Sequence, residues 1–124
     1  MPGLSRHPEP RRLPLVRERV PCVYILASAR NGTLYIGVTS NLIGRIMQHR
    51  AGVFGGFTKR HNVHVLVWYD VADTMEAAIT VEKRIKKWPR AYKLNLIEQD
   101  NPLWRDLAVE LGLPPLEGER PAHG

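Results

Sequence analysis

The sequence predicts an α+β domain whose elements follow the order β-β-α-β-α-α-α. Two apolar, β-rich runs at 22–27 and 34–38 lie on either side of Asn31-Gly32, the strongest short hairpin signal. A third β-rich run covers 63–71, and helical periodicity dominates after it. With 124 residues and 44% hydrophobic content, the chain suits one globular domain with a modest core.

The composition divides the chain into a central domain and two ends. Residues 1–20 contain five arginines and scattered prolines, which predicts a flexible basic arm, and 113–124 is predicted to be a flexible tail. Residues 21–112 then form the folded domain. The net charge of +6 is concentrated in 21–98, which carries eleven basic and five acidic residues. Such an excess is typical of proteins that bind phosphates, although it can also serve solubility alone.

The single cysteine, Cys22, excludes an intramolecular disulfide and a zinc site built on cysteines, and it fits a reducing compartment. No stretch approaches the roughly 20 apolar residues that a membrane span needs, and residues 1–20 lack the apolar segment of a secretory leader. We therefore expect a cytoplasmic protein that does not contact a membrane. No P-loop or dinucleotide fingerprint occurs, so no organic cofactor is expected.

The Asn-Gly dipeptide also sets the expected register of the first two strands. If it forms a two-residue type I′ turn, Tyr24 pairs with Thr39. Tyr35 and Gly37 then lie on the same sheet face as Tyr24, so both phenols point the same way. The missing side chain of Gly37 would leave room there for a phosphate or for the neighbours of Tyr24.

A helix is predicted from 42 to 50, because 39–41 supplies helix-capping residue types and Gly52 ends the pattern. Its polar face includes Arg45 and His49, which lie four residues apart and are therefore neighbours about 5–6 Å apart at Cβ. This face is a candidate for chemistry, although a solvated helix face has the same pattern. The opposite, mainly apolar face carries Leu42, Ile43, Ile46, Met47 and Arg50.

The glycine-rich segment 52–62 is predicted to be a mobile basic loop, and its Lys59 and Arg60 are candidate nucleic-acid contacts. The third strand follows at 63–71. Strict alternation would place Val63, Val65, Val67 and Tyr69 on one face of the sheet, and His64, Leu66, Trp68 and Asp70 on the other.

The segment 73–76 has the form of a capping box and is expected to open a helix that continues to Pro89. Glu82 falls within the apolar stripe of this helix, where a carboxylate is costly to bury unless it is paired or bound to a metal. It is therefore the most unusual acidic residue of the chain. A partly exposed Glu82 that pairs with Lys86 is the alternative.

Six basic residues and no acidic residue occur from Lys83 to Lys93, interleaved with Ile85, Trp88 and Tyr92. The pattern is typical of a surface that faces phosphates, and also of a solvated helix face.

Two further helices complete the predicted order. The first covers about 90–99. The last is expected to start at Asn101-Pro102, where an N-cap residue precedes proline, and to stop at Gly112.

These features together fit phosphodiester hydrolysis, which needs cations near the non-bridging oxygens, a metal ion and a base for the attacking water. The sequence also resembles the GIY-YIG nuclease superfamily, and within it the small stand-alone bacterial proteins that are little more than the domain. The resemblance runs from about Cys22 to Leu111. It is carried by CVY at 22–24, GTLYIGVTSNL at 32–42, Arg45, His49, Glu82, IKKW at 85–88 and NPLWRDL at 101–107.

The resemblance implies a three-stranded antiparallel sheet flanked by helices and an endonuclease that uses one divalent ion, Mg²⁺ or Mn²⁺. Tyr24 and Tyr35 match the two motif tyrosines; Tyr35 is then the expected general base, and Tyr24 orients water or phosphate. A tyrosine has a reference pKa of about 10, so a basic role needs nearby cations such as Arg45 and the metal ion.

The remaining matched residues have implied roles as well. Arg45 is expected to stabilise the transition state, and His49 to assist proton transfer or hold a phosphate oxygen. Glu82 is expected to bind the metal ion. Asn95 lies near the position of a late asparagine of the family.

The leading hypothesis is therefore a metal-dependent endonuclease acting on nucleic acid, DNA rather than RNA, in a structure-directed or repair-related role. The alternative is a non-catalytic nucleic-acid-binding module with the same fold. In it, the binding residues would be Lys59, Lys86, Lys87, Arg90 and Lys93. A third hypothesis is an interaction domain whose charge only confers solubility.

Overall fold

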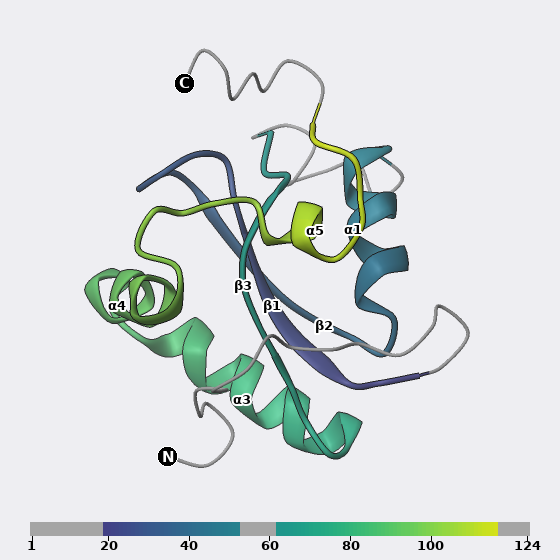
Figure 1. Ribbon diagram of the computed structural model, residues 1–124. Helices are drawn as coiled ribbons and strands as arrows, with labels where there is room; N and C mark the ends of the chain where they lie inside the picture. The colour runs from purple at the N-terminus through teal and green to yellow at the C-terminus, as the bar shows by residue number, and fades with distance from the viewer. Residues whose placement is uncertain (1–18, 53–61, 117–124) are drawn as a thin grey trace.

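The structure is a computed structural model that describes residues 19–52 and 62–116. It contains a three-stranded antiparallel sheet with the strand order β2-β1-β3 (Figure 1). The strands are β1 (Cys22–Ala27), β2 (Leu34–Thr39) and β3 (Val65–Val71), and the helices are α1 (Leu42–Arg50), α3 (Met75–Lys87), α4 (Arg90–Asp100) and α5 (Leu107–Glu110). The predicted α+β class is confirmed, and the described elements follow the predicted order.

The central strand β1 is buried on both faces and divides the core into two layers. On one face Val23 and Ile25 pack with residues of α3 and α4, and on the other Tyr24 and Leu26 pack with residues of α1 and α5 (Figure 1). Helices α1 and α3 thus lie on opposite faces of the same sheet. Both adjoin the edge strand β2, α1 by following it in the chain and α3 by packing against it.

The turn between β1 and β2 is not the two-residue turn that the sequence predicts. It spans 29–32, and the Gly32 N–H donates to the Ala29 carbonyl (2.9 Å). Asn31 alone takes the left-handed conformation, with a φ of 60°. Gly32 is needed for a different reason, because a Cβ there would lie 2.3 Å from the Ser28 Oγ.

The longer turn shifts the register of β1 and β2 by two residues. Tyr24 pairs with Gly37 rather than with Thr39. Because side chains alternate with a period of two, an even shift changes the partners but not the faces. Tyr35 therefore still lies on the same face as Tyr24, and it packs against the same part of the core.

Strand β3 departs from strict alternation because it contains a bulge. Trp68 pairs with Ile25. The next pair is Leu66 with Leu26, which leaves Val67 as the extra residue. Val67 and Trp68 consequently contribute to the same layer of the core, so the predicted division of this strand into two faces is wrong beyond the bulge.

The first two helices begin close to the predicted residues. Helix α1 starts after Asn41, whose side chain accepts a hydrogen bond from the Gly44 N–H (3.1 Å). The N-cap of α3 is Thr74, not Asp73, and its hydroxyl accepts from the Ala77 N–H (3.0 Å). The predicted capping box is therefore replaced by a simple N-cap one residue later.

The last helix, α5, is much shorter than the sequence predicts, because Asn101 does not cap it. The Asn101 side chain is buried, donates to the carbonyls of Val67 (3.1 Å) and Arg105 (2.9 Å), and accepts from the Arg105 N–H (2.9 Å). These bonds hold a loop against β3 and use the groups that would otherwise cap a helix. The predicted start at Asn101-Pro102 is wrong, and Asp106 is the N-cap of α5.

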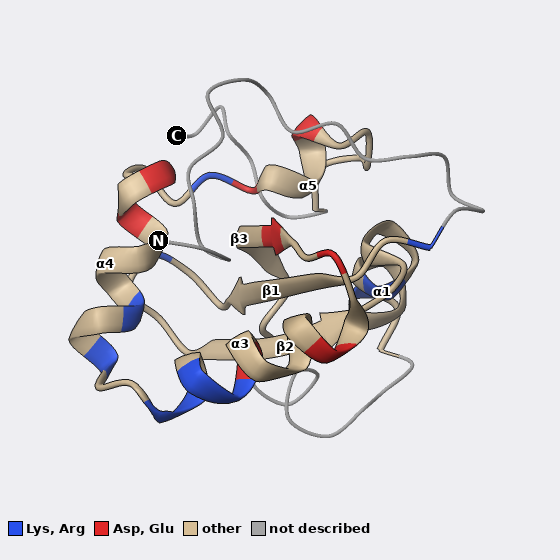
Figure 2. Ribbon diagram, turned by 90° about the horizontal axis from the view of Figure 1, so that it is seen from below, with Lys and Arg blue, Asp and Glu red and all other residues tan. Residues whose placement is uncertain are grey.

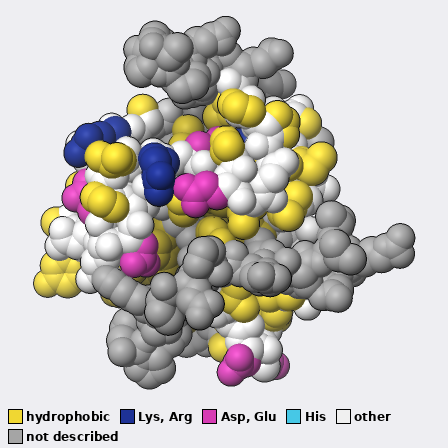
Figure 3. Space-filling model, in the orientation of Figure 1, with side chains coloured by type: hydrophobic (Ala, Val, Ile, Leu, Met, Phe, Trp, Pro, Cys, Tyr) yellow, Lys and Arg dark blue, Asp and Glu magenta, His cyan; other side chains and the backbone are white. Residues whose placement is uncertain are grey.

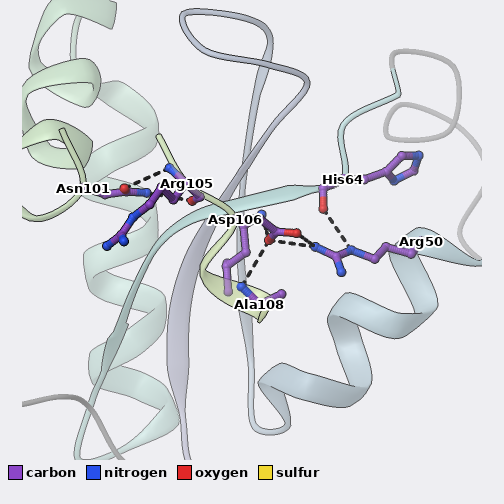
Figure 4. Close-up of polar contacts among 7 residues, drawn as sticks. Arg50, His64, Asn101, Arg105, Asp106 and Ala108 are labelled. Carbon is purple, nitrogen blue, oxygen red and sulfur yellow. Dashed lines mark hydrogen bonds and ion pairs between the residues drawn. The ribbon is translucent and has the colours of Figure 1, made fainter. Parts of the chain in front are cut away.

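The Asp106 carboxylate joins α1, β3 and α5 (Figure 4). Both of its oxygens accept from the Arg50 guanidinium (2.9 and 2.7 Å), and Oδ1 also accepts from the N–H groups of Leu66 and Ala108 (3.2 and 3.1 Å). The Arg50 Nε donates in turn to the His64 carbonyl (3.1 Å). We call this largely buried ion pair the Arg50–Asp106 clasp. It fixes the end of α1 against the start of β3.

The predicted arm, loop and tail lie mostly outside the described residues. Near the beginning of the described chain, the Val20 N–H donates to the Ser40 carbonyl (3.0 Å). Near its end, Leu113 packs against the same layer of the core as α1 and α5. No helix within 19–52 and 62–116 is long and apolar enough to cross a membrane.

The clasp predicts a large loss of stability when its carboxylate is neutralised. Asp106→Asn should lower the free energy of unfolding by about 3 kcal/mol, because it leaves the Arg50 guanidinium largely buried without its counter-charge. Glu110→Gln is the matched control, since Glu110 pairs with an arginine (3.3 Å) on the exposed surface, where such a pair is worth less than about 1 kcal/mol. Urea denaturation measures both losses, and equal values would contradict the role of the clasp.

Candidate active site

Four of the residues singled out in the sequence lie together beside β2, and a fifth, Glu82, acts on them through its charge; we call the five of them the five-residue cluster. They are Tyr24 of β1, Tyr35 of β2, Arg45 and His49 of α1, and Glu82 of α3. Tyr24 interacts with each of the others: its Oη lies 2.9 Å from the His49 Nε2, and its pKa responds to Tyr35, Arg45 and Glu82. Four separate elements thus contribute to one site.

Tyr24 reaches across the sheet because its partner in β2 is a glycine. A Cβ on Gly37 would lie 2.6 Å from the Tyr24 Oη and 2.7 Å from its Cζ. The ring therefore occupies the space of the absent side chain, and its Oη lies 2.9 Å from the His49 Nε2. Gly37 makes room for Tyr24 itself, which is more specific than the sequence-based expectation of space for a phosphate.

Burial sets the protonation states of this hydrogen-bonded pair. It raises the pKa of the Tyr24 phenol well above its usual range, with a further contribution from Tyr35, and Arg45 offsets only part of the rise. Burial also lowers the pKa of His49 to about 4, and the charges of Arg45 and His64 add to the effect. At pH 7 the phenol is therefore protonated and the imidazole neutral, so the phenol can donate to an unprotonated Nε2.

Tyr35 is the tyrosine of the cluster that solvent reaches. Its ring centroid lies 6.3 Å from that of Tyr24 and 5.2 Å from that of His49. The Tyr24 side chain is 0% exposed and His49 is 2% exposed, whereas Tyr35 is half-buried. The three rings pack against one another, and of the three residues only Tyr35 is partly exposed.

The face of α1 that meets the sheet is rotated from the one that the sequence predicts. Ile46 and His49 are buried, while Met47, predicted to be on the apolar face, is 54% exposed. The physical reason is the hydrogen bond from Tyr24, which satisfies the imidazole inside the core. Arg45 is half-buried beside them, close enough to Tyr24 to act on its pKa through charge and a hydrogen bond.

Glu82 approaches the cluster from the other face of the sheet. Its side chain is largely buried, and its Oε2 lies 2.6 Å from the Lys86 Nζ, one turn further along α3. The Glu82 charge adds to the raised pKa of Tyr24, after the larger effects of burial and of Tyr35. The sequence left open a buried Glu82 and a partly exposed Glu82 that pairs with Lys86; in the structure the side chain is largely buried and pairs with Lys86.

Glu82 is the carboxylate of the cluster that could hold a metal ion. Within the described ranges no group of three or more His, Cys, Asp or Glu side chains could enclose one. Mg²⁺, however, is commonly held by one or two carboxylates together with water and substrate phosphates. A single carboxylate next to a surface rich in Lys and Arg is compatible with that coordination. Lys86 is half-exposed and can move away from Glu82.

The predicted nucleic-acid contacts have different environments. Lys86 and Lys87 are exposed at the end of α3, and Lys93 is half-buried in α4. The Arg90 guanidinium donates to the carbonyls of Asn31 and Gly32 (2.8 and 2.7 Å), so it ties α4 to the β1–β2 turn. Lys and Arg of the described chain gather along the end of α3 and the start of α4 (Figure 2).

The remaining predicted residues are Lys59, Arg60 and Asn95. Lys59 and Arg60 lie outside the described residues, and Asn95 is exposed on α4. Sequence reasoning also missed His64, whose charge acts on His49 and whose Nδ1 is buried without a hydrogen-bond partner among the described residues. No signal in its sequence context distinguishes it from an ordinary strand residue.

The contact between Tyr24 and Gly37 predicts a non-additive pair of substitutions. Gly37→Ala should lower the free energy of unfolding by about 1–3 kcal/mol, because the new methyl group meets a rigid, buried ring. In a Tyr24→Leu background, which removes the far end of that ring, the same substitution should cost much less. A double-mutant cycle by urea denaturation measures the difference. Additive losses would contradict the proposed contact.

The neutral, buried His49 predicts a pH-dependent contribution to stability. Its pKa is near 4 in the folded state and about 6.5 in the unfolded chain, so the unfolded chain binds the proton first as the pH falls. The wild-type protein should lose up to about 3 kcal/mol between pH 6.5 and 4 relative to a His49→Gln variant, with no difference in slope above pH 7. Parallel stability curves for the two proteins would refute this prediction.

Comparison with known proteins gives the family of the chain. The family model described as the GIY-YIG catalytic domain matches residues 20–95, a range that includes the whole cluster. No solved structure matches the chain significantly.

The curated proteins similar to this chain include UPF0213 proteins. That of Syntrophus aciditrophicus is 38% identical over 79 residues, covering 63% of this chain and 90% of that protein. That of Aeromonas salmonicida is 30% identical over 98 residues, covering 77% of this chain and 71% of that protein. That of Staphylococcus haemolyticus is 35% identical over 77 residues, covering 62% and 93%. With the fold and the family model in agreement, the chain belongs to the GIY-YIG nuclease family.

Proposed function

We propose that this protein is a divalent-metal-dependent endonuclease that hydrolyses phosphodiester bonds in DNA. The observation that supports this most is the convergence of the five-residue cluster beside β2, next to a surface rich in Lys and Arg. Hydrolysis of a phosphodiester needs a base, positive charge near the non-bridging oxygens and a metal ligand. The cluster offers a solvent-accessible phenol, a guanidinium and a carboxylate.

In this proposal the residues have distinct roles. Tyr35 accepts the proton of the attacking water, because it is the tyrosine that solvent reaches. Arg45 offsets the charge that develops on the phosphate in the transition state. Tyr24 and His49 are buried, and we assign them to positioning Tyr35 and Arg45 rather than to direct contact with water or phosphate.

Glu82 is the proposed ligand of one Mg²⁺ or Mn²⁺ ion. A bound divalent ion would polarise the phosphate and add positive charge close to Tyr35. The exposed lysines Lys86 and Lys87 would contact the backbone of the substrate. We expect DNA rather than RNA, in single-stranded, branched or nicked form, and action in the cytoplasm.

A non-catalytic nucleic-acid-binding module is the second candidate, and one observation favours it. The ion pair with Lys86 at 2.6 Å engages the carboxylate proposed as the metal ligand. If this pair persists in the presence of divalent ions, the basic surface can bind a nucleic acid but the site lacks its metal.

A cleavage assay separates these functions. With Mg²⁺ or Mn²⁺ the protein should cut labelled single-stranded, branched or nicked DNA, and both Glu82→Gln and Tyr35→Phe should reduce the rate by at least about 100-fold, since each removes a group used in the chemical step. Glu76→Gln, an exposed acidic residue of the same helix, is the control and should cut at the wild-type rate.

The binding of the same DNA completes the assay. Glu82→Gln should retain wild-type affinity with a steep dependence on salt. Salt-dependent binding without cleavage by the wild-type protein would refute the nuclease proposal in favour of the binding module.

A further inference from the structure

Two aromatic side chains lie within the basic surface of α3 and α4 and are not part of the five-residue cluster. Trp88 is the C-cap of α3, and Tyr92 lies in the first turn of α4. Their rings meet edge to face with centroids 6.3 Å apart. Trp88 packs against the core, whereas Tyr92 is 59% exposed. The pair therefore presents the exposed Tyr92 ring beside a partly buried Trp88.

The backbone that carries this pair is tied to the sheet. The Arg90 guanidinium donates to the carbonyls of Asn31 and Gly32, which belong to the β1–β2 turn. The Tyr92 N–H donates to the Pro89 carbonyl (3.0 Å) and starts the helix directly after the bend. A ring held on a short, tethered turn loses little freedom when a ligand binds, which favours affinity.

The surroundings of the aromatic pair are cationic. The segment 83–93 contains six Lys and Arg and no acidic residue, and Figure 2 shows them along the end of α3 and the start of α4. Figure 3, which has the orientation of Figure 1, shows few Lys and Arg side chains, and these lie in the upper left, away from the end of α3 and the start of α4 in the lower left; the basic segment is therefore seen in Figure 2 and not on this face. An exposed aromatic ring among cations is suited to a ligand that combines a flat ring with phosphate, as a nucleotide does.

The faces of a base are covered by its neighbours inside a duplex, so a protein ring can stack only on a base that has left the duplex. We propose that Trp88 and Tyr92 form a stacking site for an unpaired nucleotide, so that the preferred substrate carries a single-stranded segment beside the cut. Trp88 follows Glu82 by six residues at the end of α3, a rise of about 9 Å along the helix. A strand stacked on the pair can therefore extend to the cluster. This inference rests on the proposed function, because it names the form of DNA that the site takes.

Binding in EDTA tests the inference without cleavage. The probes are a short fluorescein-labelled single strand and the blunt duplex that it forms with its complement, with Kd measured by anisotropy. Tyr92→Ala should raise the Kd for the single strand about tenfold and change the Kd for the duplex less than about twofold. Tyr92→Phe keeps the ring and should bind like the wild type. Leu103→Ala, an exposed apolar residue outside the basic segment, is the control and should change neither value.

Tryptophan fluorescence gives a second readout. Trp68 and Trp104 are buried, so quenching on addition of the single strand would report Trp88. No quenching, or equal weakening of both DNA forms by Tyr92→Ala, would overturn the stacking site. A protein that cuts DNA but ignores Tyr92 would refute this inference and leave the nuclease proposal intact. A protein that binds the single strand through Tyr92 and cuts nothing would support the stacking site and refute the nuclease proposal.

Discussion

The Tyr24 ring lies across Gly37 and ends on His49, and the geometry of the candidate site depends on this contact. Tyr24 belongs to the central strand, so its backbone is held from both sides by β2 and β3. The ring must then leave the strand in one direction, and it can do so because Gly37 has no side chain. Tyr35 packs against the two rings that this contact brings together. Glycine is required here for space rather than for an unusual backbone conformation.

Orientation and stability at this site come from different interactions. A hydrogen bond between neutral groups, such as that of Tyr24 with His49, contributes only about 1 kcal/mol net, while breaking a largely buried ion pair costs several times more. Arg50 directly follows His49 in the last turn of α1, so the Arg50–Asp106 clasp restrains the backbone that carries the imidazole. The clasp therefore holds the helix in place, and the weaker bond selects the position of the two rings.

The sequence predicted which side chains share a face of the sheet more successfully than which residues contact one another. The shared face of the two tyrosines was correct although the partner of Tyr24 was wrong, because period-two alternation tolerates an even shift. The bulge at Val67 adds one residue to β3, and this odd shift moves the side chains after it to the face opposite the predicted one. Glu82 was noticed because a charge interrupts an apolar stripe. The bonds of Asn101 and Arg90 join residues more than 30 positions away, and no local pattern encodes them.

If Glu82 binds a metal ion as proposed, its ion pair with Lys86 explains how the carboxylate can be paired in the free protein and still be available. Pairs four residues apart on a helix contribute only about 0.3–0.5 kcal/mol when exposed, and Lys86 is half-exposed. The cost of separating them is small compared with the attraction between a divalent ion, a carboxylate and a substrate phosphate. The same phosphate offers the displaced ammonium a new partner. Lys86 thus provides a counter-charge for the largely buried Glu82 carboxylate in the free protein. Because the pair is weak, the proposed metal ion could replace Lys86 as the partner of Glu82.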